Sequence, residues 1–214
     1  MTAVFDLEGT LTAGETWKAL ARYFQTHGRK AAYDRFFWRH LPGALLTKAG
    51  LLPKRWYQNL WMQNLARLFA GMDAEELARV ADWVVEEELW PRRKEKALAR
   101  LRELYQGGHR VVIASGAYQP VVEAFARRIG PGVEALGTPL ELRDGRATGR
   151  LAGPMNVGKV KAERVLKLLG GAPDLAFGDT AADLPLLLLA KEAVAVDPDR
   201  RLLAEAETRG FEVL

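Results

Sequence analysis

Residues 3–10 read AVFDLEGT, so that two carboxylates, Asp6 and Glu8, come immediately after a short apolar run. A short apolar run that ends in a polar turn is typical of a strand buried inside a parallel sheet. In open α/β sheets, ligands bind beyond the carboxyl ends of such strands. The stretch therefore predicts the first strand of an α/β fold, with a ligand site at its end.

Two later apolar runs end in polar residues in the same way. The residues that follow them are Ser115 and Gly116 after VVIA, and Asp179 and Asp183 after LAFG. Because the carboxyl ends of parallel strands meet at one edge of the sheet, we expect these side chains to lie near Asp6.

A lysine pair, Lys159 and Lys161, opens a helical pattern between these two segments. Together the four segments resemble the haloacid dehalogenase-like (HAD) superfamily of phosphohydrolases, in particular its phosphoserine-phosphatase-like branch, subfamily IB. The resemblance implies an α/β fold, in which a doubly wound, Rossmann-like parallel sheet core carries an inserted helical cap domain. It also implies an enzyme, a HAD-type phosphatase.

The chemistry of phosphate-ester hydrolysis gives each polar residue of the first loop a role. Asp6 is the candidate nucleophile, which attacks phosphorus and forms an acyl phosphate that water then hydrolyses. Glu8 is the candidate acid and base for the leaving oxygen and the attacking water. Gly9 lets the backbone approach the phosphate, and Thr10 hydrogen-bonds the loop. Most members of the family carry Asp where this chain has Glu8, whose carboxyl group lies one methylene further out.

The second and third segments supply phosphate-binding groups. Ser115 and the Gly116 amide are expected to hold phosphoryl oxygens, and Lys161 to add a fixed positive charge. Lys161 begins the string KAERV, which is similar to the helix start that carries the essential lysine in relatives. Lys159 is the alternative candidate for the essential lysine, and we expect it to be a substrate-binding residue.

Repulsion between carboxylates and a phosphate predicts a Mg²⁺ cofactor, since this cation prefers oxygen ligands and keeps several waters. Asp6 and Asp179 supply the carboxylates. The resemblance adds the Glu8 backbone carbonyl as a ligand and Asp183 as a support through water or a hydrogen bond. Taken singly, Asp179 is also explained as a helix cap and the lysines as surface charges; the coincidence of all the segments favours an active site.

The composition limits the classes of function. The chain has 214 residues and no cysteine, which excludes disulfides, thiolate metal sites and a cysteine nucleophile, and which suits a cytoplasmic protein. The net charge of +4 suits an anionic substrate. No nucleic-acid-binding motif is present, so we expect no nucleic-acid partner. The sequence enters its first strand directly, which predicts no secretory signal, and no apolar run approaches the ~20 residues that span a bilayer.

All six tryptophans lie within residues 14–90, where the apolar pattern is helical. The helices predicted there span residues 15–26, 30–40, 54–69 and 74–88, and Gly and Pro residues separate them. We interpret residues 14–90 as the cap domain, and residues 1–13 with 91–214 as the α/β core domain.

Strands and helices alternate after Pro91, as in a doubly wound sheet. The predicted helices span residues 95–105, 118–129, 161–169, 181–190 and 199–208, and the predicted strands span residues 110–114, 175–177, 193–196 and 211–214. Residues 133–142 and 147–151, on either side of Asp144 and Gly145, predict an antiparallel hairpin.

Three features bear on the substrate. Glu15 lies nine residues beyond Asp6, where phosphoserine phosphatases carry a glutamate that contacts the amino-acid part of the substrate. The alternative, equally expected, is that Glu15 is an ordinary polar residue in the first turn of a helix. Those enzymes also use a cap arginine, for which Arg67 is the only candidate. Residues 36–46 and 51–57 combine aromatics with cations, as interfacial helices do; the core of the cap is the favoured interpretation of these aromatics, and a membrane surface is the alternative.

The sequence therefore predicts a Mg²⁺-dependent phosphomonoester phosphatase that acts through an aspartyl-phosphate intermediate on a small phosphorylated metabolite such as phosphoserine. The alternatives are a phosphatase of a lipid phosphate, a phosphotransferase to an alcohol acceptor, and a catalytically weakened phosphate-binding protein. The oligomeric state stays open.

Overall fold

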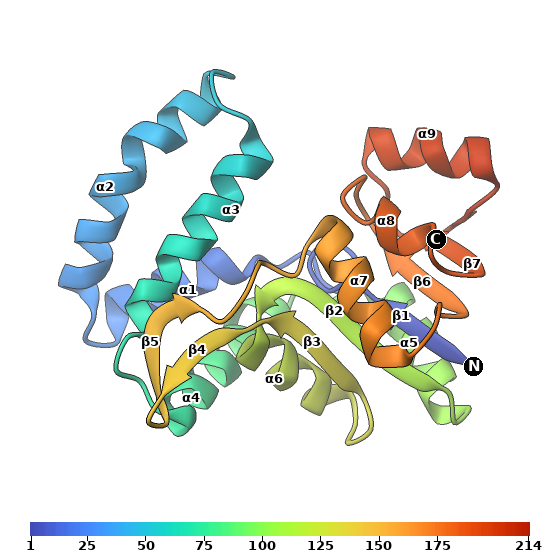
Figure 1. Ribbon diagram of the computed structural model, residues 1–214, viewed down its shortest axis with the longest axis horizontal. Helices are drawn as coiled ribbons and strands as arrows, with labels where there is room; N and C mark the ends of the chain where they lie inside the picture. The colour runs from blue at the N-terminus through green and yellow to red at the C-terminus, as the bar shows by residue number, and fades with distance from the viewer.

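Six parallel strands form the main sheet of the computed structural model, which describes residues 1–214 apart from the side chains of Lys54 and Arg55. Their order across the sheet is β3-β2-β1-β6-β7-β8 (Figure 1). The strands are β1 (Thr2–Phe5), β2 (Arg110–Tyr118), β3 (Glu134–Thr138), β6 (Leu175–Gly178), β7 (Glu192–Ala195) and β8 (Glu212–Val213). The predicted α/β fold with a doubly wound parallel sheet is confirmed.

The central strand β1 lies between two strands that are far apart in the sequence. Phe5 is paired with Ile113 of β2 on one side and with Phe177 of β6 on the other. The chain builds the sheet outward from β1 to β3, then returns to the other side of β1 and builds outward again. The switch point between β1 and β6 is where ligands bind in such sheets, and Asp6 and Asp179 follow these two strands.

Both faces of the sheet are covered by helices. Side chains of a strand alternate between its two faces, so Phe5 and Val4 belong to different hydrophobic clusters. On the Phe5 side lie α5 (Glu95–Gln106) and α6 (Gln119–Ile129), and on the Val4 side lie α7 (Gly158–Leu169), α8 (Leu184–Leu187) and α9 (Arg200–Arg209). Burial of both faces explains why the strands read as continuous apolar runs.

The chain between β1 and β2 is helical. It contains α1 (Thr16–Thr26), α2 (Lys30–Lys48), α3 (Lys54–Leu65), the 3₁₀ turn η1 (Ala66–Phe69), α4 (Ala74–Val84), the π turn η2 (Val85–Leu89) and α5. In Figure 1, α2 and α3 form a hairpin that projects away from the sheet. The predicted helices 54–69 and 74–88 are thus present, with a 3₁₀ turn and a π turn as their last parts.

One helix of this insert is longer than predicted. The predicted helix 30–40 was expected to end before Pro42, whereas α2 continues through Pro42 to Lys48. Proline weakens a helix interior because it removes a backbone hydrogen bond, but this helix also packs against α3. A Cβ atom on Gly43 would lie 2.3 Å from Cε2 of Tyr57, so the two helices approach closely at this glycine, and the Tyr57 hydroxyl donates a hydrogen bond to the His40 carbonyl.

The prediction for residues 133–142 is wrong in its first half. Residues 134–138 form β3, which pairs in parallel with β2 at the edge of the main sheet. The hairpin consists of β4 (Leu140–Arg143) and β5 (Arg146–Leu151). Its turn is the predicted one, since Asp144 and Gly145 both have positive φ, at 51° and 76°, as a two-residue hairpin turn requires.

The predicted helix 181–190 is also wrong, because only Leu184–Leu187 form α8. The preceding residues are held in a loop, in which the Thr180 amide and hydroxyl donate to Oδ2 of Asp183 at 3.3 and 3.2 Å. The other predicted helices and strands are present, with small shifts of their ends.

Candidate active site

The loop after β1 turns sharply as it leaves the sheet. The Asp6 amide still donates to the Phe177 carbonyl at 3.0 Å, and the Leu11 amide then closes the loop on the Leu7 carbonyl at 2.9 Å. Gly9 has a φ of +92°, and a Cβ atom there would lie 2.0 Å from Oδ2 of Asp179. Glycine is therefore required at this position both by its backbone conformation and by its neighbour.

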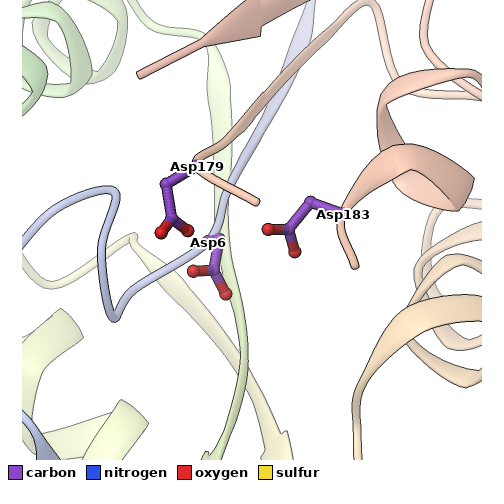
Figure 2. Close-up of side chains that lie close together, drawn as sticks. All are labelled: Asp6, Asp179 and Asp183. Atoms are coloured by element: carbon purple, nitrogen blue, oxygen red, sulfur yellow. The ribbon is translucent and has the colours of Figure 1, made fainter. Parts of the chain in front are cut away.

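Three carboxylates converge at the switch point of the sheet. Oxygen atoms of Asp6, Asp179 and Asp183 all lie within 4.8 Å of one another. Figure 2 shows the three side chains close together, Asp6 after β1, Asp179 after β6 and Asp183 at the start of α8. Asp6 and Asp183 are buried, at 6% and 4% exposure. Like charges at this separation are unfavourable unless cations accompany them.

Lys161 is the cation in contact with this cluster. Its Nζ atom donates to Oδ1 of Asp6 at 2.6 Å and to Oδ1 of Asp183 at 2.7 Å, and the side chain is buried. Burial opposes its charge, but Asp183 and Asp6 outweigh burial and raise the pKa of Lys161 above its ordinary value. Lys159 is exposed instead. The structure thus brings Lys161 to the carboxylates and leaves Lys159 at the surface.

The acids carry more negative charge than Lys161 balances. Burial raises the pKa of Asp6 well above its ordinary value, Lys161 opposes this, and Asp183 and Asp179 add to it. Burial, and then Asp183, raise the pKa of Asp179 to about 7. A donor set of buried oxygens with an excess of negative charge fits a hard divalent cation such as Mg²⁺.

Glu8 contacts the start of the helical insert. One of its carboxylate oxygens accepts a hydrogen bond from the backbone amide of Thr16, in the first turn of α1. The N-cap residue of α1, Glu15, makes no capping hydrogen bond with its own side chain, so Glu8 takes that part. Burial raises the pKa of Glu8, and the Thr16 amide opposes that shift. Glu8 therefore joins the loop after β1 to the start of α1.

Ser115 and Gly116 lie inside β2, which continues to Tyr118, and not after its end as predicted. The register of β2 with β3 shifts between Ala114 and Tyr118, which lets this part of the strand turn away from regular pairing. Ser115 is buried, and its hydroxyl accepts a hydrogen bond from the Ala117 amide at 3.2 Å. At Gly116 a Cβ atom would lie 2.7 Å from a methyl group of Val157.

Thr10 makes a different contact from the one predicted. Its hydroxyl donates to Oδ1 of Asp179 at 3.4 Å, and not to its own loop. Thr10 thus links the first loop to the loop after β6, because β1 and β6 are neighbours in the sheet.

Sequence reasoning missed two polar residues beside the site. The Nδ2 atom of Asn156 donates to the Ser115 carbonyl at 3.1 Å, and Asn156 is fully buried. The Nζ atom of Lys94 donates to the Gly9 carbonyl and pairs with Asp197 at 2.9 Å. Neither residue belongs to a motif, and a lone asparagine or lysine in sequence carries no signal of such a contact.

Comparisons with known proteins agree with this geometry. Residues 3–188 match the family of haloacid dehalogenase-like hydrolases. The chain belongs to the haloacid dehalogenase-like hydrolase family. Phosphoserine phosphatase SerB1 of Mycobacterium tuberculosis is 30% identical to it, over 99% of this chain and 69% of the relative. The predicted family and enzyme class are therefore confirmed.

Two solved structures are similar to this HAD hydrolase in fold. A protein of unknown function from Bordetella pertussis Tohama I covers 100% of this chain and 97% of its own, with a TM-score of 0.79 and 24% identity. A phospho-aspartyl intermediate analogue of phosphoserine phosphatase covers 99% of this chain and 91% of its own, with a TM-score of 0.60 and 19% identity. At these identities the likeness concerns the fold.

The carboxylate of Glu15 in this HAD hydrolase already has a partner within the protein. It forms an ion pair with Lys18, one turn further along α1. It lies close enough to Glu8 to contribute to the raised pKa of that carboxyl group. The structure therefore fits the helix-turn interpretation of Glu15 at least as well as the substrate-contacting one.

Arg67 lines a cavity of about 760 Å³ between the insert and the β4–β5 hairpin. Arg150 lies on the hairpin side of this cavity, and Asn64 and Thr148 add polar groups to its wall. Neither guanidinium has an ion pair with another side chain that the structure describes. The cavity therefore offers two unpaired cations to a ligand.

Within the described part of the chain, no helix combines the length and apolarity that a bilayer-spanning segment needs.

Proposed function

We propose that this HAD hydrolase is a Mg²⁺-dependent phosphomonoester phosphatase in which Asp6 attacks phosphorus and carries the phosphoryl group. The observation that supports the proposal most strongly is the buried contact of Asp6 with Lys161, 2.6 Å away, beside Asp179 and Asp183. A lysine held at the nucleophile by two carboxylates stays charged, and a fixed cation beside the transferring phosphoryl group stabilises the transition state.

The residues that would hold Mg²⁺ are Asp6 and Asp179 through their carboxylates and Glu8 through its backbone carbonyl, with Asp183 in support. The close approach of three acidic side chains and the raised pKa of Asp179 fit this assignment. When bound, the cation neutralises charge on the carboxylates and on the phosphate and orients them.

The first step breaks the bond between phosphorus and the leaving oxygen. A carboxylate oxygen of Asp6 forms the new bond to phosphorus, while the Gly116 amide and the Ser115 hydroxyl bind phosphoryl oxygens and Lys161 supplies positive charge. Glu8 gives its proton to the departing alkoxide. A raised pKa lets Glu8 keep that proton at a higher pH than an ordinary carboxyl group does.

The second step releases phosphate and restores Asp6. A water molecule attacks the phosphoryl group of the aspartyl phosphate, and Glu8, now a carboxylate, takes a proton from that water. The bond between phosphorus and the Asp6 oxygen breaks, and the carboxylate of Asp6 is regenerated.

In this proposal residues 14–90 form the cap domain, and residues 1–13 with 91–214 form the core. The chain crosses between the two parts twice, and Thr12 links the crossings, because its hydroxyl donates to the carbonyls of Leu89 at 2.6 Å and Arg92 at 3.1 Å. Glu8 reaches from the core to α1 of the cap. The cap then covers the carboxylates and excludes water from the site.

The proposed substrate is a small phosphorylated metabolite that carries a second anionic group, such as the carboxylate of phosphoserine. Arg67 and Arg150 face the cavity described above, and Gly153, which also lines it, precedes Asn156 by three residues. Three residues span at most about 11 Å, and Asn156 contacts the Ser115 carbonyl. A small molecule bound in the cavity can thus reach the phosphate-binding residues. A cytoplasmic location, compatible with the absence of cysteine, is part of the proposal.

Phosphate release from phosphoserine and from 4-nitrophenyl phosphate, with Mg²⁺ and with EDTA, tests the proposal. We expect the protein to release phosphate from both esters in the presence of Mg²⁺ and from neither in EDTA. In the variant Arg67→Gln, the KM should rise for phosphoserine but not for 4-nitrophenyl phosphate. Binding of phosphate without release from any ester would identify a phosphate-binding protein. Phosphoryl transfer to an added alcohol in preference to water would identify a phosphotransferase.

A further inference from the structure

The hairpin of α2 and α3 projects away from the sheet (Figure 1). It exposes several large apolar side chains. We call them the tip surface: Trp38, Leu45, Leu46, Leu51 and Trp56. Four of them are more than half exposed, with Leu51 at 70%, Trp38 at 68%, Leu45 at 58% and Trp56 at 55%. The favoured sequence-based interpretation, that the aromatics of this segment form the cap core, is thus wrong for Trp38 and Trp56.

The fold of the hairpin does not need the tip surface. Phe36 and Tyr33 are buried on the inner side of α2, and the ring of Phe36 lies 4.8 Å from that of Trp61 on α3. Trp38, Leu45 and Leu46 lie together on the outer side, since residues seven and eight positions apart share a helix face. The helix is therefore apolar on a side that the protein itself leaves uncovered.

The same hairpin carries more positive charge than the whole chain. Residues 29–56 contain seven Lys and Arg residues and a single acid, Asp34, a net charge of +6, against +4 for all 214 residues. The rest of the chain is therefore slightly negative. Arg35 and Arg39 of this set are exposed and lie on the same side of α2 as Trp38.

We propose that the tip surface docks on an anionic lipid bilayer, with Leu51, Trp56 and the leucines of α2 inserted at the level of the headgroups. Exposed leucine and tryptophan side chains next to lysine and arginine are what an interfacial helix presents to such a surface. Each cation near an anionic membrane adds to the attraction, and the long basic side chains keep their charges in water while their stems lie along the apolar layer.

Charge complementarity selects the bilayer over a second copy of this chain. Residues 35–56, which contain the tip surface, hold five Lys and Arg residues and no acid. A symmetric dimer through the tip surface would bring two such basic segments together, and like charges across an interface are unfavourable. An anionic bilayer meets the same segment with opposite charge. The attraction is electrostatic at long range, so it weakens as salt screens it.

Flotation with vesicles of equal parts phosphatidylcholine and phosphatidylglycerol tests the proposal, with pure phosphatidylcholine vesicles as the comparison. We expect the protein to float with the anionic vesicles at low salt, and to be lost from both at high salt. The double variant Leu51→Ser/Trp56→Ser should lower the vesicle affinity by about tenfold or more. The matched control Leu142→Ser/Leu188→Ser, which changes two leucines that are each 52% exposed elsewhere, should float like the wild type.

The absence of native cysteine allows a direct probe of insertion. An environment-sensitive dye on Leu51→Cys should shift its emission to the blue with the anionic vesicles, and the same dye on Leu142→Cys should not. Flotation that is equal for wild type and the Leu51/Trp56 variant, or no flotation at low salt, would overturn the proposal. The proposal would also be overturned if the wild type formed a dimer that the Leu51/Trp56 substitutions dissociate. Binding of the tip surface to an acidic protein but not to vesicles would overturn it as well. Docking needs no turnover, so these results and those on phosphate release are independent of each other.

Discussion

The Nζ atom of Lys161 lies 2.6 Å from Oδ1 of Asp6, although 155 positions separate the two residues in the sequence. The contact is buried and is shared with Asp183. It exists because the first turn of α7 lies next to the residue that follows β1.

Replacing Lys161 should impair both activity and stability. Lys161→Met leaves Asp6 and Asp183 buried without their cation, and removing one partner of a buried pair costs ~3–5 kcal/mol of the free energy of unfolding. We expect kcat/KM to fall by a factor of about a thousand, or ~4 kcal/mol of barrier. The exposed Lys159 gives the matched control: Lys159→Met should change neither the denaturation midpoint nor kcat/KM. Equal losses in the two variants would contradict the assignment.

Replacing Glu8 should separate the two chemical steps. The carbonyl oxygen of Gln in Glu8→Gln can still accept the hydrogen bond of the Thr16 amide, so the junction with α1 should persist. An activated ester such as 4-nitrophenyl phosphate needs little protonation of its leaving group, whereas the attacking water loses its base. Rapid mixing should show a burst of nitrophenolate followed by slow turnover. A uniform loss without a burst, for activated and unactivated esters alike, would make Glu8 a structural residue.

Gly9 should be needed for metal binding because it has no side chain to displace Asp179, and not only because of its positive φ. Gly9→Ala places a methyl group on Asp179, so the Mg²⁺ concentration for half-maximal activity should rise by about tenfold or more. Gly50 has a similar φ, +76°, with open space around it. Gly50→Ala therefore measures the strain of a positive φ alone, about 1–2 kcal/mol of stability, without a change in the Mg²⁺ requirement. If Gly50→Ala raises that requirement as well, the steric argument at Asp179 fails.

The metal-free protein should lose stability as the pH rises. The ordinary pKa of an aspartate is 3.8, and in the folded protein burial and then Asp183 raise that of Asp179 to about 7. A raised folded-state pKa gives a stabilising contribution that is complete below the unfolded-state pKa and disappears as the pH rises through the folded-state value. In EDTA, the free energy of unfolding should therefore fall between pH 3.8 and about 7.

Mg²⁺ should reverse that loss, because it binds the deprotonated acids. Thermal denaturation is the measurement, and the increase in Tm with Mg²⁺ should be larger above about pH 7 than near pH 3.8. In Asp179→Asn both the pH dependence and the Mg²⁺ effect should shrink. A Mg²⁺-induced increase in Tm that is the same at both pH values would speak against the carboxylates as its source.

The sheet and its acidic edge could be predicted from sequence because both depend on local patterns. An apolar run followed by Asp6 or by Asp179 identifies a strand and its carboxyl end at once. Thr10 is predicted by its place in the first such segment and Lys161 by the resemblance of its helix start to that of relatives, but neither observation predicts the residue that it contacts. Thr10 bonds Asp179 and Lys161 bonds Asp183, contacts that only the strand order creates.

The parts that could not be predicted depend on contacts between distant segments. Pro42 predicts a helix end locally, whereas α2 continues to Lys48 and packs against Tyr57 of α3 at Gly43. Asn156 and Lys94 belong to no motif, and each donates a hydrogen bond to a carbonyl group far away in the sequence, Asn156 to Ser115 of β2 and Lys94 to Gly9 of the first loop. The exposure of Trp38 could not be predicted either, because the spacing of aromatic residues along a helix does not show which side of the helix the rest of the protein covers.

Phosphoenzyme mapping tests directly whether Asp6 attacks phosphorus and carries the phosphoryl group. The Glu8→Gln variant is mixed with Mg²⁺ and 4-nitrophenyl phosphate, quenched with acid during slow turnover, digested, and analysed by mass spectrometry. We expect one phosphorylated peptide, which contains Asp6, and none when Asp6→Asn is added to the variant. A phosphoryl group on any other residue, or full turnover by the single variant Asp6→Asn, would contradict this role of Asp6.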